Sequence, residues 1–264
     1  MRIKLILEID PKPQLLPLNY KYPVSSWIYK VFAAADKDFA TQLHHVGYRT
    51  EDGKQLKLFT FSDIQVPRGQ WKIVGDRMKI WSDTVTLILS FQLPEQLQHF
   101  ITGIFTNQQL TIGDEISQLH AKVRQVEAIS QTMVPGETYR FKTLSPLFMA
   151  KKVENQPHPK YIAPTDPDYR LLFSKNLIDK YHAHCLQSET KAKPFTTDDI
   201  NLTLLTKEPK SVLQTIKAFT KEETKIQAFR FHFELSGPFE LIEIGLNAGF
   251  GAENAQGFGC CGLI

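Results

Sequence analysis

The chain has 264 residues, of which 42% are hydrophobic and 22% charged, and its formal net charge is +3. This length allows one large domain or two small ones that each bury a core. The sequence contains no apolar run of the roughly 18 residues that a membrane-spanning helix needs, so we expect a soluble protein with no membrane partner. A charge of +3 is too small to identify a nucleic-acid-binding protein. Any RNA site must therefore be a local patch.

The cysteine content and the N-terminal segment indicate a cytoplasmic protein. Of the three cysteines, Cys260 and Cys261 are adjacent, which gives neither a disulfide framework nor the paired spacings of a zinc site. Residues 1–9 alternate between apolar and polar types, unlike a signal peptide with its unbroken apolar stretch. We expect no bound metal and no cofactor.

In the first half of the chain, the hydrophobic pattern alternates between strand and helix periods. Residues 2–9 place four aliphatic side chains on one face of a strand, and helical spacing between residues 24 and 43 predicts one broken helix or two short ones. Pro94 opens a predicted helix that extends through Phe105. Further strands are predicted at residues 56–64, 71–74, 78–91 and 109–128. This order of elements is that of a ferredoxin-like domain.

The second half repeats the same order of elements. A polar, turn-prone stretch that contains Pro135 and Gly136 marks the predicted boundary, so the domains would be residues 1–130 and 137–264. A helix with Leu171 among its inward residues is predicted at residues 166–185. The other predicted elements are strands at 139–153, 200–205 and 228–235 and a helix at 238–246. We predict an α+β fold of two tandem ferredoxin-like (RRM-like) domains with a C-terminal glycine-rich loop.

The glycine-rich segment, residues 245–259, is the most specific local feature of the sequence. It contains two Gly-Phe-Gly triplets, at residues 249–251 and 257–259, between the last predicted helix and a final strand. Such glycines permit positive φ angles and let backbone N–H groups approach a phosphate. They could equally serve only a sharp turn from helix to strand. A dinucleotide-binding fingerprint is disfavoured, because its glycines follow a strand and open a helix.

The paired triplets near the C-terminus resemble the signature of the CRISPR-associated endoribonucleases that process precursor CRISPR RNA, the sixth Cas protein family. Three N-terminal segments also resemble, in order and spacing, those in which archaeal members of this family carry a catalytic tyrosine, histidine and lysine: residues 27–29, 40–44 and 56–62. The resemblance implies that Tyr29, His44 and Lys57 are the catalytic residues. His45 is an alternative to His44, which is preferred because it follows Leu43 as in the family pattern.

These residue types suit RNA cleavage without a metal ion. The reaction must deprotonate the 2′-hydroxyl, stabilise charge on the phosphate and protonate the 5′-oxygen. A histidine exchanges protons near neutral pH, a lysine supplies a positive charge, and a tyrosine helps to position or deprotonate the 2′-hydroxyl. The residues leave open which group acts as acid and which as base. The products that the resemblance implies are a 2′,3′-cyclic phosphate and a 5′-hydroxyl.

The expected RNA partner is CRISPR repeat RNA within precursor CRISPR RNA, bound in a basic cleft between the domains or along one face of the second domain. The candidate contacts are Gly249, Phe250, Gly251, Gly257, Phe258, Gly259, Lys151 and Lys152. For the two phenylalanines, anchoring of the loop to the core is the stronger interpretation. The resemblance also allows other Cas proteins of an effector complex as partners, and a monomer and a homodimer are both open.

Two other functions fit parts of the sequence. One is a non-catalytic subunit that holds CRISPR RNA in an effector complex, although such a subunit would have no chemical need for Tyr29, His44 and Lys57. The other is a small-molecule enzyme with a glycine-rich phosphate cradle, but the sequence has neither the Walker-type lysine motif nor metal-binding spacings.

Overall fold

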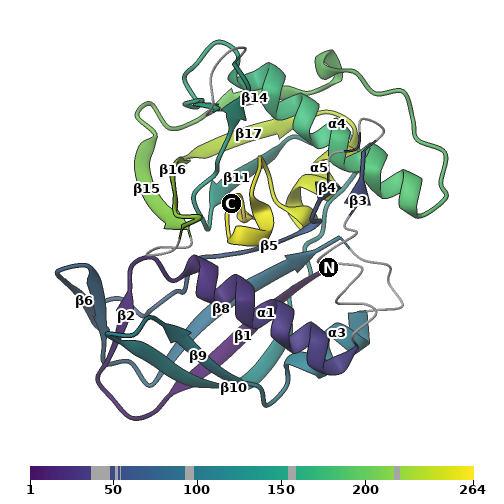
Figure 1. The fold of residues 1–264 in the computed structure, drawn as a ribbon. Helices are drawn as coiled ribbons and strands as arrows, with labels where there is room; N and C mark the ends of the chain where they lie inside the picture. The colour runs from purple at the N-terminus through teal and green to yellow at the C-terminus, as the bar shows by residue number, and fades with distance from the viewer. Residues whose placement is uncertain (37–47, 51–52, 54, 93–97, 154–158, 217–220) are drawn as a thin grey trace.

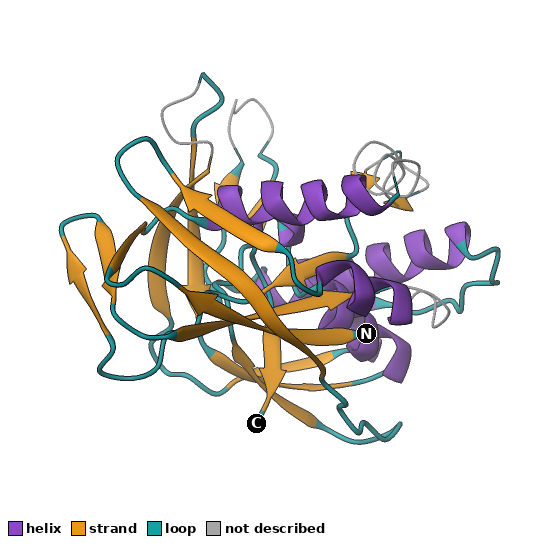
Figure 2. Ribbon diagram, turned by 90° about the horizontal axis from the view of Figure 1, so that it is seen from below, coloured by secondary structure: helices purple, strands orange, loops and turns teal. Residues whose placement is uncertain are grey.

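The structure is a computed structural model that describes residues 1–36, 48–50, 53, 55–92, 98–153, 159–216 and 221–264. Its two main sheets, each with helices against it, form the lower and upper halves of the molecule in Figure 1. Viewed from below, the strands spread over one side of the molecule and most of the helical turns gather on the other (Figure 2). None of the described helices is long and apolar enough to cross a membrane.

The lower half is built on a five-stranded antiparallel sheet with the order β5-β8-β1-β10-β9. Its strands are β1 (Arg2–Ile9), β5 (Phe59–Phe61), β8 (Thr84–Phe91), β9 (Gln109–Gly113) and β10 (Gln118–Ala128). Helices α1 (Lys21–Ala35) and α3 (Gln98–Phe105) pack on it. Phe32 of α1 forms edge-on ring contacts with Phe91 and Phe105, which ties both helices to the sheet. These aromatic rings give the first core its close packing.

The upper half contains a four-stranded sheet with the order β14-β17-β11-β18. The strands are β11 (Tyr139–Thr143), β14 (Asn201–Leu204), β17 (His232–Ser236) and β18 (Cys261–Leu263), and the helices that cover them are α4 (Tyr169–Gln187) and α5 (Phe239–Ala248). In both halves the first ferredoxin strand lies between the third and the fourth. The predicted tandem ferredoxin-like fold is therefore confirmed.

Short additional strands project from the two main sheets. They are β2 (Gln14–Pro17), β3 (Tyr48–Arg49), β4 (Gln55–Leu56), β6 (Trp71–Val74), β7 (Arg77–Ile80), β12 (Ala150–Lys151), β13 (Lys160–Tyr161), β15 (Lys210–Ile216) and β16 (Thr224–Arg230). The hairpin of β15 and β16 was not predicted, and only residues 228–230 of β16 fell within a predicted strand.

The strands predicted at 56–64, 78–91 and 228–235 are each divided between sheets, the first of them between β4 and β5. The strand predicted at 78–91 forms β7 and β8. A bend at Asp83 separates them, and the Ser82 Oγ accepts a hydrogen bond from the Thr84 N–H across it. The strand predicted at 228–235 leaves the β15–β16 hairpin at Phe231 and enters the main sheet as β17. Alternation of apolar and polar residues continues through the junction of β16 and β17, so the hydrophobic period does not reveal where that strand changes sheets. At the junction of β7 and β8 the alternation is interrupted at residues 81–84.

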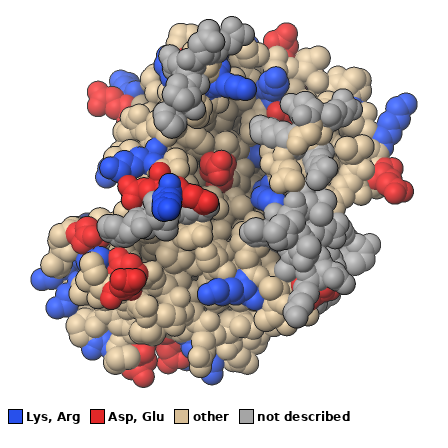
Figure 3. All heavy atoms as spheres, viewed as in Figure 1, with Lys and Arg blue, Asp and Glu red and all other residues tan. Residues whose placement is uncertain are grey.

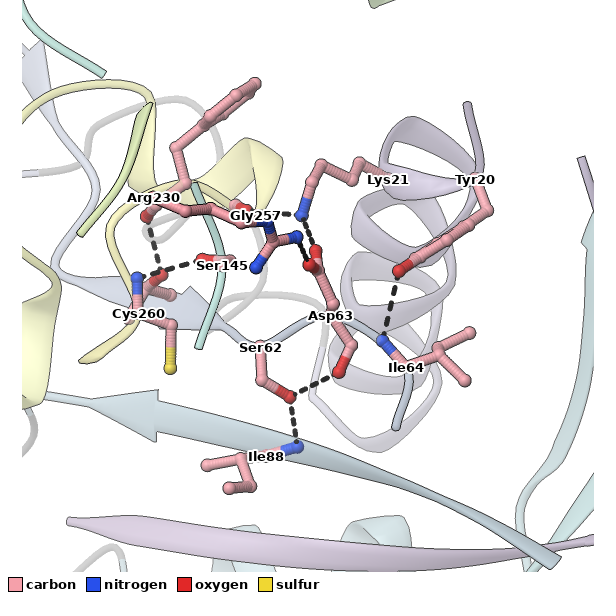
Figure 4. Close-up of polar contacts among 12 residues, drawn as sticks. Tyr20, Lys21, Ser62, Asp63, Ile64, Ile88, Ser145, Arg230, Gly257 and Cys260 are labelled. Atoms are coloured by element: carbon pink, nitrogen blue, oxygen red, sulfur yellow. Dashed lines mark hydrogen bonds and ion pairs between the residues drawn. The ribbon is translucent and has the colours of Figure 1, made fainter. Parts of the chain in front are cut away.

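A partly buried group of charges joins the two halves (Figure 4). The Asp63 carboxylate, just after β5, accepts a hydrogen bond from Lys21 Nζ at 2.5 Å and also pairs with Arg230 of β16. The same Lys21 ammonium donates to the Gly257 carbonyl oxygen at 2.8 Å. Burial, with a smaller effect of Arg230, lowers the pKa of Lys21, while the Asp63 carboxylate favours its charged form. These contacts fix the glycine-rich segment against the first half.

Candidate functional site

A pocket of about 380 Å³ lies where the two halves meet the glycine-rich segment. It is lined by Tyr29, Gln55, Leu56, Lys57, Asn176, Lys180, Gly251, Ala252, Glu253, Asn254, Ala255 and Gln256. Tyr29 and Lys57, which the family resemblance assigned to one catalytic site, thus lie on the wall of the same pocket. On the face shown in Figure 3 the surface is hollowed between the two halves, and the lysines and arginines are scattered over it.

Tyr29 reaches the pocket from the middle of α1. The apolar face of this helix is buried in the first core, and the Tyr29 ring packs edge-on against Phe59 of β5 with 5.5 Å between the ring centroids. Burial raises the pKa of the Tyr29 hydroxyl well above its usual value. The phenol therefore stays protonated near neutral pH, so it is suited to hydrogen bonding and unsuited to acting as a phenolate base.

Lys57 lies in the short connection between β4 and β5. Its neighbours Leu56 and Leu58 are buried in the second core, whereas Lys57 is only partly buried and lines the pocket. Burial lowers the pKa of the Lys57 ammonium from its usual 10.5. A partly desolvated ammonium interacts more strongly with a bound anion than one in bulk water.

The histidine of the predicted catalytic set, His44, and the alternative His45 lie outside the described residues. Their assignment stays a prediction. Among the residues that are described, no group of three or more histidines, cysteines, aspartates or glutamates could hold a metal ion.

The glycine-rich segment is held by hydrogen bonds to its carbonyl groups. The Lys180 ammonium on α4 donates to the carbonyl oxygens of Gly249 at 2.5 Å and Gly251 at 2.7 Å. Asn254 Nδ2 donates to the carbonyl oxygens of both Phe250 and Phe258, each at 3.0 Å, and so ties the two Gly-Phe-Gly triplets together. Lys21 holds the second triplet from the side of the first domain.

Two glycines of this segment are required by close packing. Gly257 has a φ of 84°, and a Cβ there would collide with the ring of Phe61 on β5. Gly259 has a φ of 70°, and a Cβ there would collide with the Phe250 carbonyl oxygen. Both positions combine a left-handed backbone with no room for a side chain. These glycines therefore serve the turn geometry, and phosphate binding by this segment stays a prediction.

The predicted RNA contacts fall into three groups. The side chains of Phe250 and Phe258 are fully buried, so they anchor the segment and are not placed to stack on a base. Gly251 lines the pocket, whereas Gly249, Gly257 and Gly259 are not part of its lining. Lys151 and Lys152 are exposed and away from the pocket wall, and Lys151 pairs with Asp168 at 2.7 Å.

Sequence reasoning missed Lys180 and Asn176, although a signal for them existed. They are four residues apart on α4, so they lie on one face of the helix, next to the buried Leu177. A polar pair on the apolar face of a helix is unusual and marks a position where hydrogen bonds are needed. Leu171, which was predicted to point inward, is instead 55% exposed.

Two family models match the chain. The model described as "CRISPR associated protein Cas6, C-terminal" covers residues 130–263, and the one described as "CRISPR-associated protein Cas6, N-terminal" covers residues 15–124. The chain is 24% identical over 261 residues to CRISPR-associated endoribonuclease Cas6 1 of Methanocaldococcus jannaschii. The aligned region covers 98% of this chain and 91% of that protein. It is also 24% identical over 263 residues to CRISPR-associated endoribonuclease Cas6 of Pyrococcus furiosus, with 97% and 87% covered.

Solved structures show the same fold over the full length of the chain. A structure described as a Cas6-related gene product from Pyrococcus furiosus superimposes with a TM-score of 0.79 at 22% identity, and 100% of this chain and 98% of that one are covered. A second, described as "An RAMP protein binding different RNA substrates", gives a TM-score of 0.77 at 23% identity, with 100% and 99% covered.

The lysine beneath the glycine-rich segment gives a test of how that segment is held. Lys180→Met leaves the buried carbonyls of Gly249 and Gly251 without their donor, so we expect the free energy of unfolding to fall by about 2–4 kcal/mol. Chemical denaturation measures this change. The control is Lys175→Met, at an exposed position of the same helix, which should change stability by less than about 0.5 kcal/mol. Equal stability of the two variants would contradict the assigned role.

Proposed function

The chain belongs to the Cas6 family of CRISPR-associated proteins, and on that premise we propose that it is an endoribonuclease that cleaves CRISPR repeat RNA in precursor CRISPR RNA. One observation carries the proposal. Tyr29 and Lys57 come from different elements, 28 positions apart in the sequence numbering, yet both line the pocket beside the glycine-rich segment. Their chemistry matches two of the tasks in RNA cleavage, orientation of the nucleophile and stabilisation of the phosphate.

The proposed reaction needs no metal ion. The ribose 2′-oxygen attacks the adjacent phosphorus while its proton is taken up by a base, and the bond to the 5′-oxygen breaks as that oxygen receives a proton. The products are a 2′,3′-cyclic phosphate and a 5′-hydroxyl. His44 exchanges one of these protons, Lys57 stabilises the negative charge on the phosphate, and the protonated Tyr29 hydroxyl orients the 2′-hydroxyl.

The chain path is compatible with a role for His44 at this pocket. Tyr48 of β3 is paired with Leu56 of β4, and Leu56 lines the pocket directly before Lys57. His44 lies four positions before Tyr48 in the sequence. A segment of four residues spans at most about 15 Å, so the sequence allows His44 to reach the pocket.

Cleavage of the cognate repeat RNA in the presence of EDTA tests the proposed activity. Wild-type protein should cut the RNA and leave 2′,3′-cyclic phosphate ends, because the attacking oxygen belongs to the RNA itself. A single 2′-deoxy nucleotide at the cut site should abolish cleavage for the same reason. His44→Ala should slow the reaction by about 100-fold or more, as removal of a general acid or base typically does.

The control for His44→Ala is His45→Ala, which changes the adjacent histidine. Loss of activity in His45→Ala with full activity in His44→Ala would transfer the role to His45. Cleavage that depends on an added divalent metal, or cleavage of the 2′-deoxy RNA, would overturn the mechanism. Tight binding of the repeat with no scission would overturn the nuclease and favour a subunit that only holds RNA.

The lowered pKa of Lys57 gives a second prediction, for the dependence of cleavage on pH. The cationic form is the active one, and it is lost as the pH rises through a pKa that burial has brought below 10.5. Arginine keeps its charge to higher pH. In Lys57→Arg the alkaline limb of kcat/KM should therefore move to higher pH, whereas Lys57→Ala should lose about 100-fold or more.

The control for this profile is Lys175→Arg, at an exposed position away from the pocket, which should leave the pH profile unchanged. If the alkaline limb has the same midpoint in Lys57→Arg and in wild type, Lys57 is not the group whose charge the reaction needs.

A further inference from the structure

Asn176 is a buried polar residue in the wall of the pocket that the proposed chemistry does not use. Its side chain is only 7% exposed, and it lies one helical turn before Lys180 on α4. The Lys180 ammonium donates hydrogen bonds to two carbonyl oxygens of the glycine-rich segment. The Asn176 carboxamide oxygen, in contrast, is buried and has no hydrogen-bond partner among the described residues.

Gln256 has the same property on another wall of the pocket. It ends the short helix η4 (Asn254–Gln256) of the glycine-rich segment, and its carboxamide oxygen is also buried without a partner in the described part of the chain. Glu253, at the start of this turn, adds a carboxylate to the lining. Three side chains that carry acceptor oxygens therefore surround one small pocket.

A buried acceptor without a donor lowers the stability of the folded protein, and such groups are rare in native structures. Two of them on one pocket indicate that a ligand supplies the missing donors. The terminal torsion of a carboxamide has a broad energy minimum, so each oxygen can turn toward a ligand at little cost. Functional sites commonly retain such groups at the expense of stability.

We propose that Asn176 and Gln256 form a nucleobase subsite, in which their carboxamide oxygens accept hydrogen bonds from the base of a nucleotide next to the cleaved phosphate. This inference rests on the proposed function, because the same pocket holds Tyr29 and Lys57. Proteins that recognise RNA sequence usually do so by bonding the edges of unpaired bases. The subsite extends the role of the pocket from catalysis to sequence selection.

The acceptor-rich lining predicts which bases this subsite prefers. Adenine, cytosine and guanine each present an exocyclic amino group, which can donate to carboxamide and carboxylate oxygens. Uracil has no amino group and offers these oxygens only its single ring N–H. The subsite should therefore disfavour uracil.

The test combines cleavage rates with thermal unfolding. The substrates are repeat RNAs in which each of the two nucleotides flanking the cut is A, C, G or U in turn. Their cleavage rates are compared for wild-type protein and Asn176→Leu. Leucine has a volume similar to that of asparagine but no polar side-chain atoms. At one flanking position, wild-type kcat/KM should be at least about tenfold lower for U than for the best base. In Asn176→Leu this preference should shrink to less than about threefold, and the thermal midpoint should be equal to or above that of wild type.

A matched control is available on the same helix. Ser174 is fully buried and its hydroxyl also lacks a partner among the described residues, but it does not line the pocket. Ser174→Ala should therefore leave the base preference unchanged. If Asn176→Leu fails to fold, Gln256→Leu provides the same test from the other wall.

The outcomes separate this subsite from the proposed nuclease. If wild-type protein cleaves RNAs with each of the four bases at equal rates at both positions, the subsite is overturned and the proposed nuclease stands. An unchanged preference in folded Asn176→Leu and Gln256→Leu does the same. Failure of wild type to cleave any repeat overturns the proposed function itself.

Discussion

Hydrogen bonds from two buried lysines to the carbonyl groups of the glycine-rich segment are the interaction on which the rest of the structure depends. Lys180, from the second half, holds the first Gly-Phe-Gly triplet, and Lys21, from the first half, holds the second. A buried ammonium is stable only when its hydrogen bonds are made. The segment therefore cannot take its place unless both halves are folded around it, and the pocket forms only in that assembled state.

The tandem fold could be predicted because helix and strand periods survive in the sequence, but the position of individual side chains could not. Leu171 on α4 is exposed, while Lys180 on the same helix is 1% exposed. This is the reverse of the usual pattern, in which leucines are buried and lysines are exposed. The reason lies in residues far along the chain: the carbonyls that Lys180 satisfies belong to Gly249 and Gly251. Periodicity carries no information about such distant partners.

Two residues that line the candidate site were named before the structure, and their catalytic role stays a prediction. The resemblance to the family assigned Tyr29 and Lys57 to the same site, and both line one pocket. The residues alone did not assign them, since a tyrosine on a helix beside Phe32 is more often a packing residue and a lysine near the end of a strand usually lies on the surface. Asn176 and Gln256 could not be predicted, because their distinguishing feature is a buried carboxamide oxygen without a hydrogen-bond partner, and only the folded structure shows this.

Burial in this pocket shifts the pKa values of Tyr29 and Lys57 in opposite directions. It raises the pKa of the phenol, which becomes harder to ionise, and lowers the pKa of the ammonium, which becomes easier to neutralise.

The most direct measurement is a structure of the protein bound to its repeat RNA with a 2′-deoxy nucleotide at the cut site. If RNA is cleaved in this pocket, the phosphate at that site will lie within about 3 Å of Lys57 Nζ, with the preceding ribose beside the Tyr29 hydroxyl. The contradicting result is a cut-site phosphate elsewhere, for example in the larger groove of about 760 Å³ that Trp71, Leu213 and Arg230 help to line.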